Sequence, residues 1–360
     1  MLGKQLKYLA GVADIARMDF ESAALTLNSE DGKLTSIYIG GFSSGWREVD
    51  DDSLVDNEFN VSVHALKFKA VASLFADDES IILDLSNPDS LKLRSKHSQA
   101  TLQRWSEETS RADVWEDDEV KDPLFGFRMQ AAALVTEVDV ASGFVSENSI
   151  KAIFTGVRLQ VSKKQARLTA FDGFGCLVES YLDCKTRGEG ETTPPSADFM
   201  LGLKLVAGAN DIIVARPRNR DAVVVYNSDR SAMFRCSVIA DKWPSTEKIT
   251  DAPIVGTELK MPLESVKNLT TGGKVFDTGE IILEPVGNMT RFIVRADEGG
   301  EYTTRIKGAI EHRSIYDLTM FARVAHLDSE IKLTVPPSSV YPTVAVSKHG
   351  NRRAWLVARN

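Results

Sequence analysis

The residues that most often do chemistry are scattered in this sequence and form no catalytic pattern. No two of its five histidines have the spacing of a metal-binding pair; they are His64, His97, His312, His326 and His349. Neither the HExxH motif of zinc proteases nor the GxSxG motif of serine hydrolases occurs. The sequence therefore predicts a protein that is not an enzyme and that holds no metal or cofactor.

Two short motifs come nearest to a chemical site. Residues 271–274 read TGGK, but they lack the first glycine and the following Ser or Thr of a phosphate loop. Asp172 precedes Gly173, and aspartate in such a pair usually forms a turn. The three cysteines, Cys176, Cys184 and Cys236, are too few and too irregular for a zinc site or a disulfide framework, so we expect buried or free thiols.

The composition is that of an ordinary globular protein. The chain has 360 residues, of which 43% are hydrophobic and 26% are charged, a length that suits two or three domains. No apolar run approaches the roughly 18 residues of a membrane span, and we expect a cytoplasmic protein without a membrane partner. The net charge of −8 argues against indiscriminate nucleic-acid binding but permits a local basic surface.

The elements that would position these residues recur three times. Hairpin patterns with turn residues between alternating apolar strands cover 24–41, 156–173 and 279–297. Each is followed by a helical pattern and then by further strands. An acidic run from Asp113 to Asp122, before Pro123, is typical of a linker.

A repeat of about one third of the chain is too long for a solenoid, whose units have roughly 20–50 residues. It indicates tandem domains, with boundaries predicted at 1–122, 123–252 and 253–360. In each domain two helices would cover one face of a mainly antiparallel sheet. The predicted fold class is therefore α+β, in three tandem copies.

Positive charge is concentrated on the predicted helices, which cover 4–17, 64–75, 129–146, 197–208, 262–274 and 310–326. Together they carry a net charge of +3, so the rest of the chain carries −11. This contrast suits a polyanion that contacts one surface only, through phosphates and without reading sequence. The middle domain is the exception, because residues 129–146 contain no Lys or Arg, and Lys151 just beyond them would compensate.

The candidate DNA-contacting residues are Lys4, Lys7, Arg17, Lys67, Lys69, Lys151, Lys204, Lys267, Lys274, Arg313 and Arg323. The alternative for each one is an ordinary charged residue on a solvated helix face.

Two stretches resemble the bacterial sliding clamp, the β subunit of DNA polymerase III. Residues 168–177, LTAFDGFGCL, are similar to the family's strand that ends in an Ala-Thr-Asp-Gly-His-Arg-Leu turn. Residues 234–239, FRCSVI, followed by Trp243-Pro244-Ser245, resemble the family's strand and its Phe-Pro-Asp-Tyr corner. The motifs cover some thirty residues, whereas the three-domain plan covers the whole chain.

The resemblance implies three copies of a DNA-clamp domain and a head-to-tail homodimer that forms a six-domain ring. Helices would line the hole and sheets would face outward. Such a processivity factor encircles double-stranded DNA without regard to sequence and tethers the replicative DNA polymerase. A clamp loader would be a further partner.

The resemblance also implies a partner-peptide groove between the middle and last domains. Carried over by position, its residues are Phe154, Phe171, Gly173, Phe174, Gly175, Cys176, Pro244, Lys248, Ile249, Leu356, Val357 and Arg359. Phe174-Gly175 replaces the family's His-Arg pair, and residues 356–360, LVARN, replace its Met-Pro-Met-Arg-Leu tail. These departures favour a divergent, phage-encoded member that binds a different peptide.

Two alternatives remain open. Phe154, Phe171, Phe174 and Cys176 would, on a purely structural interpretation, belong to an inter-domain core. A structural protein of tandem β-rich domains, such as a virion or scaffold component that does not encircle DNA, would also have repeats. That alternative leaves the charge contrast between the helices and the remainder without a purpose.

Overall fold

The computed structural model describes residues 1–17, 24–51, 58–106, 121–147, 149–208, 211–296 and 298–359. The predicted acidic linker therefore lies outside the described residues, apart from Lys121 and Asp122. Within the described residues the chain divides into two compact units. The first comprises Met1–Val135, Val161–Lys164 and Cys184–Val238, and the second comprises Thr136–Gln160, Gln165–Asp183 and Ile239–Asn360.

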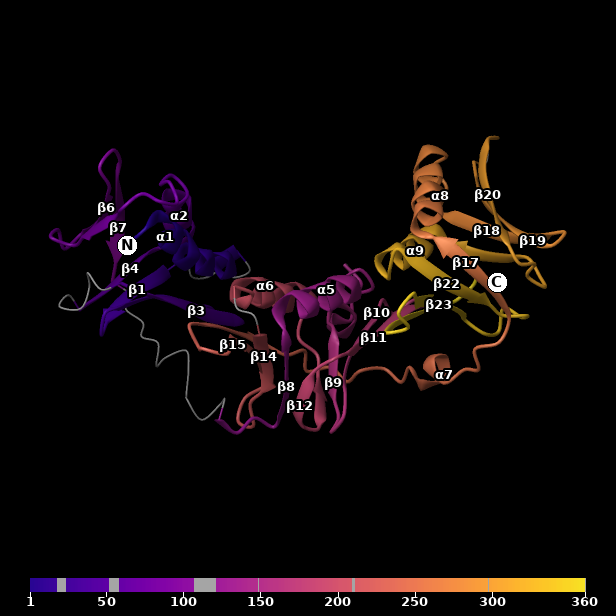
Figure 1. Cartoon of the computed structure of the whole chain (residues 1–360), viewed down its shortest axis with the longest axis horizontal. Helices are drawn as coiled ribbons and strands as arrows, with labels where there is room; N and C mark the ends of the chain where they lie inside the picture. Colours follow the sequence, from indigo (N-terminus) through magenta and orange to yellow (C-terminus); the bar gives the residue numbers. More distant parts are fainter. Residues whose placement is uncertain are drawn as a thin grey trace. The chain divides into compact units, whose positions relative to one another are not determined.

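The helices, labelled in Figure 1, follow the expected periodicity with shorter bounds. They are α1 (Gly3–Ala10), η1 (Gly11–Arg17), α2 (Ala65–Ala72), α5 (Ala131–Ser142), η3 (Ala152–Thr155), α6 (Ser196–Val206), α7 (Glu247–Thr250), α8 (Leu263–Val275), α9 (Leu318–Arg323) and η4 (Val324–His326).

One predicted helix, 310–326, is wrong over its first part. Ser314–Asp317 forms strand β21, in which Tyr316 pairs with Ile281 of the neighbouring strand. The helix begins only after Asp317, whose carboxylate accepts hydrogen bonds from the backbone N–H groups of Thr319 and Met320 at 2.8 and 3.2 Å. Such a cap fixes a helix N-terminus. Arg313 consequently precedes the strand and lies on no helix.

The first unit is built on one twelve-stranded sheet, in the order β12-β8-β14-β15-β16-β3-β2-β1-β4-β7-β6-β5. Its strands are β1 (Ala24–Glu30), β2 (Lys33–Ile39), β3 (Ser43–Asp50), β4 (Phe59–His64), β5 (Ile82–Asp84), β6 (Ser90–Arg94), β7 (Gln99–Trp105), β8 (Phe125–Gln130), β12 (Lys185–Gly188), β14 (Asp211–Arg216), β15 (Ala222–Asn227) and β16 (Ala232–Ser237). The short strand β13 covers Gly190–Thr192.

The second unit contains two sheets. One runs β9-β10-β11-β24-β23-β22-β17 and the other β20-β19-β18-β21. The strands are β9 (Arg158–Val161), β10 (Ala166–Phe171), β11 (Cys176–Leu182), β17 (Thr257–Pro262), β18 (Glu280–Val286), β19 (Met289–Arg295), β20 (Glu301–Lys307), β22 (Glu330–Val335), β23 (Thr343–Ser347) and β24 (Arg352–Leu356).

The turns explain why these hairpins form where the sequence predicts them. Asp31 and Gly32 join β1 to β2 with φ values of 51° and 72°. Both central residues of this two-residue turn therefore have positive φ, the geometry for which an Asp-Gly pair is favoured. Gly287 plays the same part between β18 and β19, with φ of 61°.

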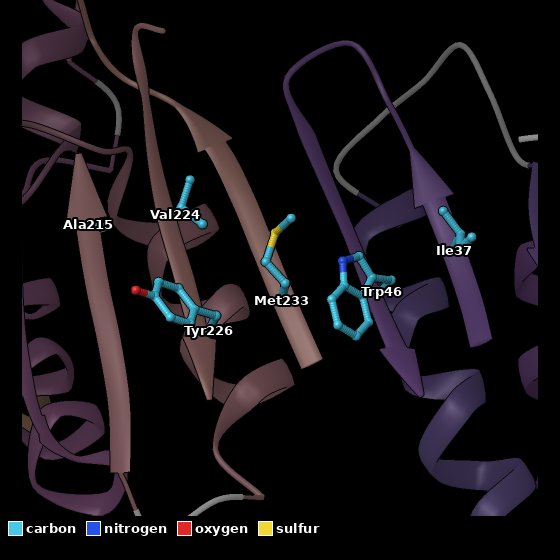
Figure 2. Close-up of a cluster of buried hydrophobic side chains, with 6 residues drawn as sticks. All are labelled: Ile37, Trp46, Ala215, Val224, Tyr226 and Met233. Carbon is cyan, nitrogen blue, oxygen red and sulfur yellow. The ribbon is translucent and has the colours of Figure 1, made fainter. Parts of the chain in front are cut away.

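Within the first unit, a buried apolar cluster lies where β16 pairs with β3 (Figure 2). Met233 of β16 is the register partner of Trp46 of β3, and both are at most 1% exposed. Ile37, Ala215, Val224 and Tyr226 complete the cluster. Directly opposed side chains of neighbouring strands contact one another, so this register fixes the join between β16 and β3.

The second unit repeats this join. There β24 pairs with β11, with Cys176 opposite Leu356 and Leu177 opposite Trp355. In each case the last strand of a three-strand hairpin accepts the strand that ends a later set of three.

Candidate functional site

The turn between β10 and β11 is held by a buried carboxylate. Asp172 is 3% exposed, and its Oδ1 accepts hydrogen bonds from the backbone N–H groups of Phe174, Gly175 and Cys176 at 2.8, 3.0 and 3.0 Å. Its Oδ2 accepts a hydrogen bond from the guanidinium of Arg323 at 2.9 Å. Asp172 therefore has the structural role that the sequence predicts, and Arg323 of α9 balances its charge.

Glycine is required next to Asp172. Gly173 has φ of 83°, and a Cβ atom at this position would lie 2.6 Å from the ring of Phe154. Phe154 in turn packs edge-on against Phe171, with 5.4 Å between ring centroids. Both rings are half-buried, so they form the floor beside the turn.

Phe174 lies at the tip of this turn and points away from the core. Its side chain is 83% exposed, so it does not belong to a core within the described structure. Val357, which is 38% exposed, lies beside the turn because its N–H donates to the carbonyl of Gly175 at 3.0 Å. An exposed phenylalanine and valine on a rigid turn form an apolar surface available to a partner.

A buried cluster supports this surface from below. Leu177, Val344 and Trp355 form its centre, and Phe171, Ile249 and Val346 pack against it. Leu356 is buried in β24, Pro244 is half-buried, and Lys248 is exposed. We call the turn 172–176 together with this cluster the β11–β24 site.

The chain end is fastened beside the same site. The N–H of Arg359 donates to the carbonyl of Ile315 at 2.8 Å. Its guanidinium pairs with Glu280 at 3.0 Å and with Asp317. Arg359 therefore has acidic partners of its own in the second unit.

The cysteines are inert as the sequence predicts. All three are described and none is disulfide-bonded. Burial, together with the negative charge of Asp172, raises the pKa of the Cys176 thiol far above its ordinary value. Burial likewise raises the pKa of Cys236. Among the residues that the structure describes, no group of three His, Cys, Asp or Glu side chains could hold a metal ion.

The predicted DNA-contacting residues fall into two groups. Lys4, Lys67, Lys151, Lys204, Lys267 and Lys274 are exposed, as is Arg313 in its loop. The others have ion-pair partners: Lys7 lies 2.6 Å from Asp77, Lys69 lies 2.5 Å from Asp14, and Arg17 lies 3.6 Å from Asp14.

Arg323 differs from the rest, because its side chain is 20% exposed and binds Asp172. Its geometry assigns it to the β11–β24 site, whatever contact it makes with DNA.

Sequence reasoning missed three contributors to the site. Arg323 was assigned to DNA, while Trp355 and Met320 were not assigned at all. The carbonyl of Met320 lies 4.0 Å from the Cys176 sulfur. The Asp-Gly turn was the available signal for an organising carboxylate, but no local pattern indicates which distant arginine reaches it.

Comparisons with known proteins were made by sequence and by structure. The sequence matches no protein-family model and no curated protein. Solved structures do match over the full length. The Pseudomonas aeruginosa DnaN sliding clamp (DNA polymerase III subunit beta), solved bound to griselimycin, has a TM-score of 0.83 and 13% identity, covering 100% of this chain and 98% of that one.

Two clamps from other bacteria agree. The Thermotoga maritima DNA polymerase III beta subunit has a TM-score of 0.81 and 14% identity, with 100% and 98% of the two chains covered. The Helicobacter pylori beta clamp, solved with a DNA ligase peptide, has a TM-score of 0.79 and 17% identity, with 99% and 97% covered.

The chain therefore has the fold of the bacterial DNA polymerase sliding clamps. Its solved neighbours are DnaN proteins, the beta subunits of DNA polymerase III, as the two sequence motifs predict. In addition, none of the helices in the described ranges is long and apolar enough to cross a membrane.

Proposed function

We propose that this protein is a DNA sliding clamp, a processivity factor that encircles duplex DNA and tethers a replicative polymerase. The observation that carries the proposal is the match of the whole chain to clamp structures, with 97–98% of each neighbour covered. Its action would be topological, with no bond made or broken.

We further propose that the chain comprises three clamp domains, 1–122, 123–252 and 253–360, and that two chains associate head to tail. Support comes from the repeated strand joins. β3 accepts β16, and β11 accepts β24. By the same rule β20, the last strand of the third hairpin, would accept β7 of a second copy.

The strand edges are suited to such a join. In the described residues β20 pairs with β19, and its side chains alternate between exposed and half-buried. β7 pairs with β6 along its length and meets β4 only at Arg104 and Trp105. Unpaired edges of this kind are ready to accept another strand.

Helix contacts support the same arrangement. Within the first unit, η1 packs against α6 next to the β3–β16 join. The equivalent pair at the proposed interface is α8 of one copy and α2 of the other. Val275 ends α8 and is 71% exposed, while Leu74, just beyond α2, is 74% exposed. Leu74 and Ile82 line a cavity of about 850 Å³ that would receive the partner.

The exposed lysines on the helices would supply the DNA contacts. They carry positive charge in a chain whose net charge is −8, so attraction to phosphate would be confined to them. Weak, screened, sequence-independent contacts are what sliding requires. The β11–β24 site would bind peptides of the polymerase and of a clamp loader, as the Helicobacter pylori clamp binds a ligase peptide.

Retention on DNA tests the topological part of this proposal. We expect protein loaded onto nicked circular DNA to remain bound at about 0.5 M salt, which weakens phosphate contacts strongly, and to leave within seconds once the circle is linearised. Gel filtration of the loaded complex measures retention. Equal loss from circles and linear DNA, or equal retention on both, would contradict encirclement.

A further inference from the structure

The β11–β24 site has a structural counterpart in the first unit. The N–H of Val357 donates to the carbonyl of Gly175, and in the same way the N–H of Ser237 donates to the carbonyl of Phe42 at 2.9 Å. Residues 40–43 thus form a turn equivalent to 172–176, one residue shorter. Both turns expose a phenylalanine, since Phe42 is 71% and Phe174 is 83% exposed.

The counterpart contains a cavity of about 190 Å³. Its lining includes the turn residues Phe42, Ser43 and Ser44, together with Arg220 and Arg235. It lies at the end of the sheet face that carries the apolar cluster of Figure 2, because Ser44 and Arg235 lie two residues beyond Trp46 and Met233 on the same strands. Side chains two residues apart on a strand share a face.

The strand register shows how the two sites differ chemically. Ser44 is opposite Arg235, and Arg235 is opposite Val224. The equivalent positions in the second unit are Leu177, Trp355 and Val344, the centre of its apolar cluster. Two large apolar side chains are therefore replaced here by a serine and an arginine.

The polar groups of the cavity favour an anionic ligand. Ser43 and Ser44 are 4% and 1% exposed, and neither hydroxyl has a hydrogen-bond partner in the described structure. Buried hydroxyls left in this state are costly, and a ligand oxygen would accept from them. The one acidic lining residue, Asp221, is paired with Arg216 at 2.5 Å, so Arg220 and Arg235 leave the cavity positively charged.

We propose that this cavity is a second partner site, which binds a short acidic peptide segment of another protein. A glutamate or aspartate carboxylate would lie between Arg220 and Arg235 and accept from the serine hydroxyls. An apolar neighbour in the peptide would pack on Phe42. A peptide fits better than a free anion because the exposed ring lies next to the charged cavity, as Phe174 lies over the β11–β24 site.

This proposal goes beyond the clamp function and does not depend on ring closure or on DNA. Its probe is a fluorescein-labelled hexapeptide of alternating glutamate and leucine, titrated with the full-length protein and followed by fluorescence anisotropy. We expect saturable binding with a Kd below about 1 mM, and Arg220→Ala or Arg235→Ala to weaken it roughly tenfold through loss of a charged hydrogen bond.

Matched variants separate the site from general electrostatics. Arg218→Ala removes a nearby exposed arginine that pairs with Asp122 at 3.0 Å and does not line the cavity, so binding should be unchanged. Ser44→Ala removes one hydroxyl with little change in volume and should weaken binding about threefold. Phe174→Glu should have no effect, because it alters the other site. Thermal unfolding of each variant shows that it is folded.

Several results would overturn the proposal. They are the absence of saturable binding, equal binding of the hexapeptide with glutamine in place of glutamate, and equal affinity in folded Arg220→Ala and Ser44→Ala proteins. Loss of binding in Phe174→Glu would also overturn it, since the peptide would then occupy the β11–β24 site.

Discussion

Asp172 shows how one side chain can organise a binding surface without contacting a ligand. Its two carboxylate oxygens accept three backbone N–H groups and one guanidinium, which leaves the phenylalanine at the tip of the turn no freedom to fold inward. A buried carboxylate is tolerated only when it is paired in this way. Phe174 is thus presented to solvent by its neighbours.

Asp172→Ala should lower the free energy of unfolding of the second unit by about 3–5 kcal/mol, because it leaves Arg323 and three N–H groups unpaired in a buried setting. Urea denaturation measures this. Lys332→Ala is the matched control: it breaks an ion pair with Glu258 whose side chains are 47% and 58% exposed, and it should cost at most about 1 kcal/mol. Equal losses in the two variants would refute the role given to Asp172.

Phe174→Glu should abolish stimulation of the cognate polymerase while changing the free energy of unfolding by less than about 0.5 kcal/mol, since an 83% exposed side chain contributes little to folding. Primer extension on a long template measures stimulation. Ile150→Glu, a substitution of a fully exposed apolar residue in the same unit, should leave stimulation intact. Normal stimulation by Phe174→Glu would place the partner site elsewhere.

At the scale of elements, the turns carry more information than the strands they join. The turns 40–43 and 172–176 connect equivalent strands, yet their lengths and side chains differ. The paired strands need only alternate apolar and polar residues, whereas a tight turn needs particular backbone angles. Local chemistry at the turns therefore sets what each join presents to solvent.

Gly173→Ala tests this at the β11–β24 site. The added methyl group faces both a positive φ of 83° and the Phe154 ring at 2.6 Å, and we expect a loss of about 2–4 kcal/mol in unfolding free energy. Gly287→Ala, at φ of 61° with nothing within 4 Å, has only the backbone cost of about 1 kcal/mol. Chemical denaturation compares them. A loss no larger than that of Gly287→Ala would mean that Phe154 moves freely.

At the scale of the whole molecule, a repeated strand join leaves one edge unused at each end of the pattern. β20 and β7 are those edges, and a second copy of the chain can satisfy both. A heterologous contact of this kind closes when the rotation returns to its start, and otherwise it forms an open filament. The proposed dimer is the closed solution.

Leu74→Glu and Val275→Glu should each weaken self-association at least tenfold, because a charge would be buried in both interfaces of the dimer. Analytical ultracentrifugation measures this, with Val340→Glu, a substitution at an 82% exposed position, as the control.

Mixing the two variants provides a stricter test. In a head-to-tail dimer, a mixed pair carries both charges in one interface and leaves the other intact, so association should partly recover. No recovery on mixing, or a trimer in the unmodified protein, would contradict the arrangement.

The sequence by itself determined the repeated pattern of helices and hairpins, the turn at Asp172-Gly173, the inert cysteines and the likeness to sliding clamps. These follow from local rules, since alternation of apolar residues and the φ preferences of Asp and Gly act over a few residues. The same rules misplaced the start of the last helix, where Tyr316 is drawn into a strand by its partner Ile281.

Only the tertiary structure decided which distant residues meet. Arg323 lies 151 positions beyond Asp172 in the sequence, and its ion pair exists because α9 lies beside the β10–β11 turn. The opposition of Ser44 and Arg235, which gives the first unit its charged cavity, depends on strand register across 191 positions of chain. A sequence pattern fixes which face a residue occupies, whereas register and packing between remote strands fix its neighbours.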